Sequence, residues 1–313
     1  MVVPIFNGAS FLRRTLESLL AQTYRDFTLV CIDDLSADDS LSIARSFTDG
    51  RMRVMRNDVR RGLGGNWNAA FDAAETSYLV IAHQDDVYEP RFLEATLDVL
   101  EEHPRAFMAH TRALYIDERE RPEPAAALRF KDAFWPDAEP YQREPRQELA
   151  TLQKGNYIIC PAVMFRMSAV ATIGRFNENY RFVTDWEYWM RGLLAGFTIT
   201  GTHARLIRWR RHSGSATTQE EATLRRYDEE LALLEWLSDT AQLPRRIEAV
   251  ENTLLSEFAT RVARGDRAGA SILQRYARER LPHSRRVHAV MRLGMLGGIP
   301  AGRSASHCSA TSK

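Results

Sequence analysis

The fold is decided by one stretch, Tyr78-Leu79-Val80-Ile81-Ala82-His83-Gln84-Asp85-Asp86-Val87-Tyr88-Glu89-Pro90, in which an apolar run ends at two adjacent carboxylates. The run from Tyr78 to Ala82 is rich in β-forming residues and predicts a buried strand. Two like charges at the end of such a strand repel one another and need a cation or water to offset them. Hard divalent cations are held by one or two carboxylates together with phosphate oxygens of a substrate. The simpler alternative is that Asp86 or Glu89 caps a helix that begins near Pro90.

Strands and helices alternate in the part of the chain before this stretch. Strands are predicted at residues 1–6, 27–32 and 52–55, and amphipathic helices follow at about 10–20, 41–47 and 66–74. This alternation is typical of a parallel sheet that is covered on both faces, and ligands bind such sheets beyond the carboxyl ends of the strands. Asp33 and Asp34 follow the second strand as Asp85 and Asp86 follow the fourth. Two acidic pairs are therefore expected on one edge of the sheet.

Composition indicates an ordinary globular protein. The chain has 313 residues, of which 44% are hydrophobic and 27% charged, which suffices for one large domain and a smaller one. A formal net charge of +1 argues against binding nucleic acid through bulk charge. The cysteines Cys31, Cys160 and Cys308 have no Cys-x-x-Cys spacing, which favours a reducing compartment without structural zinc. No apolar run reaches the ~18 residues of a membrane span and no signal-peptide pattern is present, so we expect a cytoplasmic protein.

The glycine-containing turns exclude two common nucleotide-binding motifs. The first turn, residues 7–10, reads Asn-Gly-Ala-Ser rather than Gly-x-Gly-x-x-Gly, and in the loop at Gly62 a tryptophan, Trp67, replaces the last glycine. A Gly-Lys-Ser/Thr phosphate loop is also missing, so an NAD enzyme or a P-loop NTPase is disfavoured. An acidic sheet edge suits a nucleotide that arrives with its own divalent metal, because one carboxylate can accept from a base or ribose while another binds the ion.

Several motifs of this sequence occur in the order found in one enzyme family. They are Val3-Pro4-Ile5-Phe6-Asn7-Gly8, residues 18–27 (SLLAQTYRDF), residues 32–40 (IDDLSADDS), the Asp85-Asp86 pair, residues 174–178 (GRFNE), residues 184–191 (TDWEYWMR) and residues 209–215 (WRRHSGS). Together they resemble the family 2 inverting glycosyltransferases of the GT-A fold, over about two-thirds of the chain. The resemblance implies an α/β fold with a mixed, mainly parallel sheet flanked by helices.

The resemblance also implies roles for individual residues. Asp185 matches the general base, and Asp86 would hold Mg²⁺ or Mn²⁺ on the donor diphosphate. The other implied donor-binding residues are Pro4 and Asn7 beside the base, Asp34 with Asp33 at the base or ribose, and Asp85 near the ribose. This sequence departs from the family at His83, where many relatives carry another acidic residue. Its first strand also begins abruptly at Met1, as if a few residues were missing.

A second chemical centre is predicted at residues 184–197. Thr184 or Asp185 could simply cap a helix there, with Trp186 among the residues of its buried side. Displacement at an anomeric carbon needs a carboxylate that takes the proton of the acceptor hydroxyl, and a cation that neutralises the departing diphosphate. Glu187 is a weaker candidate for the base, because it lies further into the helix.

The basic stretch after the predicted sheet allows two interpretations. Arg210, Arg211 and His212 could grip a diphosphate, as an Arg-x-His stretch of the family suggests, with His212 hydrogen-bonding phosphate or completing the metal sphere. Alternatively the stretch is a solvated strand end.

The middle of the chain is predicted to be irregular at residues 118–148, which are rich in proline and charge. This segment is either a solvated connector or an acceptor loop whose aromatic side chains suit sugars or lipid carriers. Residues 156–166 are predicted to form an apolar strand that Cys160-Pro161 interrupts, with Cys160 a buried small side chain.

The chain beyond the predicted sheet is helical and basic. We predict a glycosyltransferase domain at 1–218, with a nucleotide-binding half at 1–116 and an acceptor half at 117–218, then a helical extension at 219–300 and a disordered tail at 301–313. The extension could rest on anionic lipid at the inner membrane face, pack on the main domain or pair with a second subunit. The arginines of its basic end, from residue 261 on, are Arg261, Arg264, Arg267, Arg275, Arg278, Arg280, Arg285, Arg286 and Arg292.

Together with the family resemblance, these observations predict a metal-dependent inverting hexosyl- or deoxyhexosyltransferase. It would move a sugar from a nucleoside diphosphate to a hydroxyl of a saccharide or lipid-linked acceptor. The resemblance alone implies that this transfer belongs to the assembly of surface polysaccharide or glycolipid. A sugar-nucleotide nucleotidyltransferase is an alternative, although it should carry a glycine-rich, basic first loop. The other alternative is a non-catalytic nucleotide- or sugar-binding module, against which the presence of both Asp86 and Asp185 argues.

Overall fold

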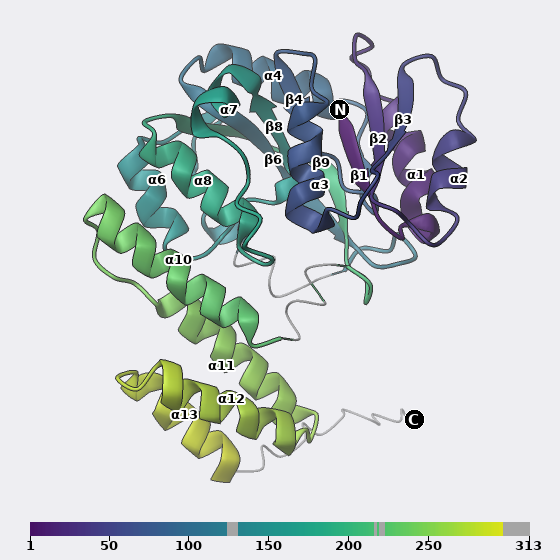
Figure 1. The fold of residues 1–313 in the computed structure, drawn as a ribbon. Coiled ribbons are helices and arrows are strands. Elements are labelled where there is room, and N and C mark those ends of the chain that lie inside the picture. The colour runs from purple at the N-terminus through teal and green to yellow at the C-terminus, as the bar shows by residue number, and fades with distance from the viewer. Residues whose placement is uncertain (124–130, 216–217, 219–222, 297–313) are drawn as a thin grey trace, which may run out of the picture. The chain divides into compact units, whose positions relative to one another are not determined.

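The first three strands of the chain form a parallel sheet (Figure 1). The computed structural model describes residues 1–123, 131–215, 218 and 223–296. Strands β1 (Val2–Ile5), β2 (Leu29–Asp33) and β3 (Met52–Arg56) lie in the order β1-β2-β3. Every residue of β2 is buried, because helices cover both of its faces. The alternation predicted from the sequence is therefore confirmed.

A second, mixed sheet follows in the order β4-β8-β6-β9-β5, with β7 paired to β9. β6 and β9 are parallel, whereas the other pairs of this sheet are antiparallel. A parallel bridge between Val2 and Ile81, together with a 2.8 Å hydrogen bond from Ala82 N to Val2 O, places the chain after β4 beside β1. The ends of β1, β2 and β4 thus reach one edge. The strands are β4 Tyr78–Val80, β5 Val87–Tyr88, β6 Ala106–Ile116, β7 Tyr141–Gln142, β8 Val163–Arg166 and β9 Thr198–Arg210.

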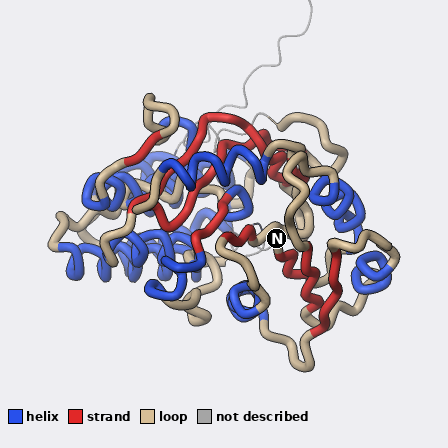
Figure 2. Tube along the Cα trace, turned by 90° about the horizontal axis from the view of Figure 1, so that it is seen from above, coloured by secondary structure: helices blue, strands red, loops and turns tan. Residues whose placement is uncertain are grey.

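Helices pack on both sides of the strands (Figure 2). On one side, α1 (Ala9–Leu20), α2 (Ser40–Arg45) and α4 (Phe92–Glu102) share one apolar core with alternate residues of β1 and β2. On the other side, aromatic rings of α3 (Gly62–Asp72) and α8 (Thr184–Leu194) meet Phe165 of β8. Successive side chains of β1 and β2 point to opposite faces, so both layers of helices bury residues of these strands.

The segment 156–166 differs from the predicted strand. Residues 156–159 are not extended in a sheet, Cys160–Ala162 form a 3₁₀ turn (η1), and only β8 is a strand. Proline has no N–H to give to a ladder, which explains why pairing begins after Pro161. Cys160 is buried, as predicted. Helix α7 (Met167–Ile173) follows β8 directly.

The long middle segment contains some regular structure. It includes β7 and the start of α6 (Pro145–Leu152). Residues 124–130 of this segment, and the tail predicted at 301–313, lie outside the described residues.

Contacts divide the chain into two units, Met1–Arg246 and Ile247–Lys313. The first unit includes α10 (Arg225–Ala241), although the sequence-based boundary at 218/219 assigns this helix to the extension. In the second unit α11 (Glu248–Ala263), α12 (Arg267–Arg280) and α13 (Arg285–Leu296) pack on one another around side chains such as Phe258 and Met291. Among the described helices, none combines the length and the apolar character that a membrane span requires.

Candidate active site

Asp34 follows β2 and is almost completely buried. Its carboxylate accepts hydrogen bonds from the backbone N–H groups of Arg61 at 2.7 Å and Gly62 at 2.8 Å. The side-chain amide of Asn57 donates a third bond at 2.8 Å. Asp34 therefore fixes the start of α3 at the sheet edge. Both of its carboxylate oxygens already accept hydrogen bonds from the protein.

Asp33 and Asn7 hold the loop that follows β2. The Asp33 carboxylate accepts from Ser36 N at 3.2 Å and forms an ion pair with Arg56 at 3.2 Å. Asn7 has a φ of 49°, a left-handed conformation that asparagine tolerates, and its side-chain oxygen accepts from Ala37 N at 2.8 Å. The turn after β1 and the loop after β2 are thus tied to each other.

Gln84 ties the turn after β1 to the second acidic pair. Its side-chain amide exchanges two 2.9 Å hydrogen bonds with the backbone of Phe6, one in each direction. A Cβ atom on Gly8 would overlap this amide, so glycine is required there for steric reasons. Pro4 lies half-buried in β1, two residues before this contact.

Asp86 is the carboxylate of this edge whose pKa is raised furthest from its ordinary value. It is fully buried, and its Oδ1 accepts from Arg210 N at 2.8 Å. Its Oδ2 has no hydrogen-bond partner among the residues that the structure describes. Burial, and then the neighbouring charge of Asp85, raise the pKa of Asp86 well above its ordinary value. This oxygen therefore requires a proton or a cation.

His83 offers a second free ligand atom beside Asp86. Its Nε2 is buried and, within the described part of the chain, also has no partner, while its ring stacks on Trp67 with centroids 5.4 Å apart. Burial lowers the pKa of His83, which favours the neutral imidazole that metals bind. One ligand atom each of His83, Asp85 and Asp86 lie within 4.8 Å of one another. This donor set fits a divalent metal ion.

His212 reaches the same turn from the chain after β9. Its Nε2 lies 2.8 Å from Asp85 Oδ2, and its ring packs on Phe11 with centroids 4.8 Å apart. The structure thus brings together the predicted residues Asp85, Asp86 and His212.

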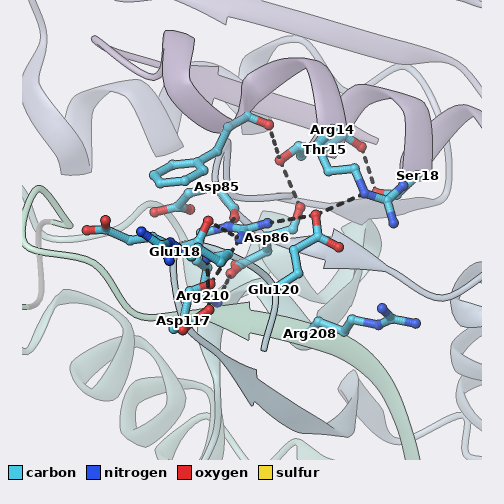
Figure 3. A network of polar contacts seen from close by, with 12 residues as sticks. Arg14, Thr15, Ser18, Asp85, Asp86, Asp117, Glu118, Glu120, Arg208 and Arg210 are labelled. Carbon is cyan, nitrogen blue, oxygen red and sulfur yellow. Dashed lines mark hydrogen bonds and ion pairs between the residues drawn. The ribbon is translucent and has the colours of Figure 1, made fainter. Parts of the chain in front are cut away.

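The contacts of the Arg210 guanidinium are made within the protein. Its guanidinium donates to the backbone oxygens of Asp85 at 2.8 Å and Asp117 at 3.1 Å, and it pairs with Glu120 at 3.3 Å (Figure 3). These contacts fix the end of β9 against the acidic turn.

Asp185 lies in the first turn of α8. Its Oδ1 accepts from Trp186 N at 2.7 Å, and its Oδ2 accepts from the side-chain amide of Asn156 at 3.2 Å. Burial raises the pKa of Asp185. The cap position of α8 is Val183, which argues against the alternative that Thr184 or Asp185 is the capping residue. Each carboxylate oxygen of Asp185 accepts one hydrogen bond from the protein.

Glu187 is occupied elsewhere on α8. It forms an ion pair with Arg191, with Glu187 Oε1 2.9 Å from Arg191 Nε. This contact agrees with the preference for Asp185 over Glu187.

The thiol of Cys160 is affected by the charges of both Asp86 and Asp185. Burial contributes most to the raised pKa of its thiol, and the charges of Asp185 and Asp86 raise the pKa further. Both carboxylates therefore lie within electrostatic reach of one buried side chain.

Three residues of the site carry little or no signal in the sequence. Asn156 and Gln84 border apolar stretches, and a polar residue at the edge of a buried segment is the only signal that sequence offers for them. Glu229, which bonds the turn before α8, lies far along the chain and gives no such signal.

Comparisons with known proteins agree with this architecture. The sequence profile described as "Glycosyl transferase family 2" matches residues 1–174. A crystal structure of Staphylococcus aureus TarS residues 1–349 in complex with UDP-GlcNAc superposes with a TM-score of 0.60 at 16% identity, covering 84% of this chain and 72% of that one. This likeness shows the GT-A fold.

Two relatives illustrate the similarity in sequence. An uncharacterized protein of Mycobacterium tuberculosis is 28% identical over 237 residues, 75% of this chain and 74% of the relative. A "PGL/p-HBAD biosynthesis glycosyltransferase" of Mycobacterium bovis is 27% identical over 195 residues, 61% of this chain and 68% of the relative. Because the family profile covers more than half of the chain, this protein belongs to glycosyl transferase family 2.

Proposed function

We propose that this glycosyltransferase is metal-dependent and inverting, and that it transfers a sugar from a nucleoside diphosphate to a hydroxyl group. The observation that carries the proposal is that the structure contains two aspartates, Asp86 and Asp185, in different environments. Asp86 has a buried, unpartnered oxygen beside His83 and Asp85, within the described residues, and Asp185 has a raised pKa and an orienting amide.

Asp185 acts as the general base. It takes the proton of the acceptor hydroxyl while that oxygen bonds to the anomeric carbon and the bond to the diphosphate breaks on the opposite face. The raised pKa makes the carboxylate a stronger base, and the Asn156 amide keeps one of its oxygens oriented. A single displacement of this kind inverts the anomeric configuration.

Asp86, Asp85 and His83 would hold the divalent cation. When bound, the ion supplies positive charge that stabilises the leaving diphosphate. An imidazole in the donor set favours Mn²⁺ over Mg²⁺, because nitrogen ligands suit softer ions. His212 approaches the phosphates beside Asp85, and Pro4, Asn7, Asp33 and Asp34 contact the base and ribose. A uridine nucleotide is the first donor to test, since TarS was crystallised with UDP-GlcNAc.

The acceptor is a saccharide or lipid-linked hydroxyl in surface polysaccharide or glycolipid assembly. The mycobacterial relative is named for a role in biosynthesis, which supports placing this transfer in the assembly of a larger product. In the second unit, Val290 and Leu293 of α13 are 45% and 69% exposed among exposed arginines such as Arg292. We include peripheral contact with anionic lipid at the inner membrane face in this proposal.

Calorimetry with UDP, GDP, dTDP and CDP, each with and without Mn²⁺, tests the proposal. We expect one nucleotide to bind in a Mn²⁺-dependent manner, and His83→Ala to weaken the Mn²⁺ affinity measured on the nucleotide-free protein. Binding of no nucleotide, or binding that ignores the metal, would contradict metal-dependent transfer.

Asp185→Asn separates catalysis from binding. We expect turnover to fall roughly a hundredfold or more, the range for losing a general base, while nucleotide affinity stays nearly the same. A strong loss of donor affinity with little loss of turnover would remove Asp185 from this role.

A further inference from the structure

Glu229 of α10 holds the turn that precedes α8. Its Oε2 accepts from three consecutive backbone N–H groups, those of Arg181 at 3.1 Å, Phe182 at 2.8 Å and Val183 at 3.3 Å. Its Oε1 also accepts from Arg181 N at 3.2 Å. Successive N–H groups form a concavity that binds anions, and hydrogen bonds to a carboxylate are stronger than neutral ones. The turn is therefore fixed by a charge from a distant part of the chain.

The turn before α8 lacks a cap from its own side chains. Val183 occupies the cap position and has no side-chain acceptor. The hydroxyl of Thr184 donates to Tyr180 O at 3.0 Å, which closes the turn but leaves its N–H groups to Glu229. Glu229 therefore binds the backbone of residues 181–183, immediately before the first residue of α8.

A second contact from α10 reaches the same turn. The guanidinium of Arg226 lies over the ring of Phe182, 5.1 Å from its centroid. Arg226 and Glu229 are three residues apart, so they share one face of α10. Both side chains are nearly buried, at 7% and 9% exposure, which indicates that this face of α10 is packed against the turn.

The turn determines where the carboxylate of Asp185 lies, because Asp185 follows Val183 by only two residues. A displacement of about 1 Å at a reacting group can lower a rate about a hundredfold. We propose that Glu229 is a positioning residue for the transfer reaction, acting through the turn 181–183 on Asp185. This inference rests on the proposed role of Asp185 as the base.

The test compares Glu229→Ala and Glu229→Gln with a matched control, Glu235→Gln. Glu235 lies on the same helix and forms an exposed ion pair with Arg245 at 3.4 Å. Three experiments are compared. Calorimetry gives the Mn²⁺-dependent nucleotide affinity, and steady-state kinetics give kcat and KM for release of the nucleoside diphosphate from its sugar conjugate, beginning with UDP-GlcNAc. Hydrogen exchange is followed at residues 181–190.

We expect Glu229→Ala to lower kcat about tenfold or more, to leave nucleotide affinity and the donor KM unchanged, and to speed exchange at 181–190. Glu229→Gln keeps one acceptor oxygen and should recover part of kcat, and Glu235→Gln should match the wild type. Unchanged kcat in both Glu229 variants, or unchanged exchange at 181–190, would overturn the inference. If Glu229→Ala fails to fold, Glu229→Gln alone decides. Failure of the proposed function is distinguishable from failure of this inference. In that case the wild type itself would neither bind nucleotide with Mn²⁺ nor release the nucleoside diphosphate from its sugar conjugate.

Discussion

Because of Asp185, we expect the acid limb of the pH–kcat profile to lie at a higher pH than for an ordinary aspartate. Burial raises the pKa of its carboxylate, and the base works only when ionised, so kcat rises with pH through a value above the ordinary 3.8 of an aspartate. The hydrogen bond from Asn156 lowers this pKa, so Asn156→Ala should move the acid limb to still higher pH. The measurement is kcat against pH for the wild type and Asn156→Ala.

Asn252→Ala is the control for this profile, because Asn252 bonds Arg286 within the second unit. An acid limb that stays in place in Asn156→Ala would show that the amide does not tune the base.

The buried Asp86 carboxylate should destabilise the metal-free protein when it is ionised. Its raised pKa means that above the ordinary value the native state binds more protons than the unfolded state, so stability falls as pH rises through that window. Asp86→Asn keeps an acceptor for Arg210 N and removes the buried charge. We expect it to raise Tm at pH 8 by roughly 2–4 °C without metal and to abolish any rise caused by Mn²⁺ with nucleotide. Thermal unfolding with and without Mn²⁺ measures both effects, and a lower Tm at pH 8 would contradict the argument.

At the scale of single residues, the sequence predicts which residue types form the site better than it predicts which of their polar atoms have hydrogen-bond partners. The adjacency of Asp85 and Asp86 after an apolar run was enough to predict an acidic edge. The His83 ring, whose Nε2 lacks a partner among the described residues, stacks on Trp67 of α3, and the amide on Asp185 comes from Asn156. Such pairings depend on chain crossings that no local pattern encodes.

The turn after β1 makes a prediction at the scale of elements. Gln84 pairs with the backbone of Phe6 as a neighbouring strand would, and this pairing needs a residue without Cβ at Gly8. Gly8→Ala should lower the free energy of unfolding by about 1–3 kcal/mol, the range for overpacking, and weaken nucleotide binding. Denaturant unfolding and calorimetry measure the two effects.

Gly50→Ala is the matched control, because a Cβ there would have no atom within 4 Å. Equal losses in the two variants would show that helix or loop propensity, rather than the Gln84 contact, is responsible.

Strand–helix alternation was predictable, but element ends were less so. Apolar residues of 156–159 suggested a strand, yet they belong to a segment that Lys131 fixes through the backbone oxygen of Asn156 at 2.6 Å. The helix expected from residue 184 is present as α8, but the turn before it is held by Glu229 of α10, which no local pattern marks. In both cases a tertiary contact replaced the local signal.

The second unit makes a prediction for the whole molecule. If α13 rests on anionic lipid, the full chain should sediment with phosphatidylglycerol vesicles, and more weakly as salt increases. The double variant Val290→Ser with Leu293→Ser should weaken this binding roughly tenfold, because two apolar side chains no longer enter the interface. Val59→Ser, at a position 67% exposed in the first unit, is the control. Equal binding of the double variant and the wild type would remove α13 from this role.

Family and fold were within reach of the sequence, because the motifs lie in order along it and the family profile covers residues 1–174. The domain boundary at 218/219 stays a prediction, although contacts group α10 with the first unit. Helix periodicity alone could not assign α10, since Leu231 and Leu234 would be buried by any partner.

Cys160 gives this enzyme a natural vibrational probe. Its buried thiol stays protonated, since burial and two nearby carboxylates oppose ionisation. The S–H stretch of a thiol absorbs where other protein groups are silent, and its frequency responds to the local electric field. With the other two thiols removed by Cys31→Ala and Cys308→Ala, infrared spectra could follow the electric field at Cys160, to which Asp86 and Asp185 contribute, as metal and donor bind, without any added label.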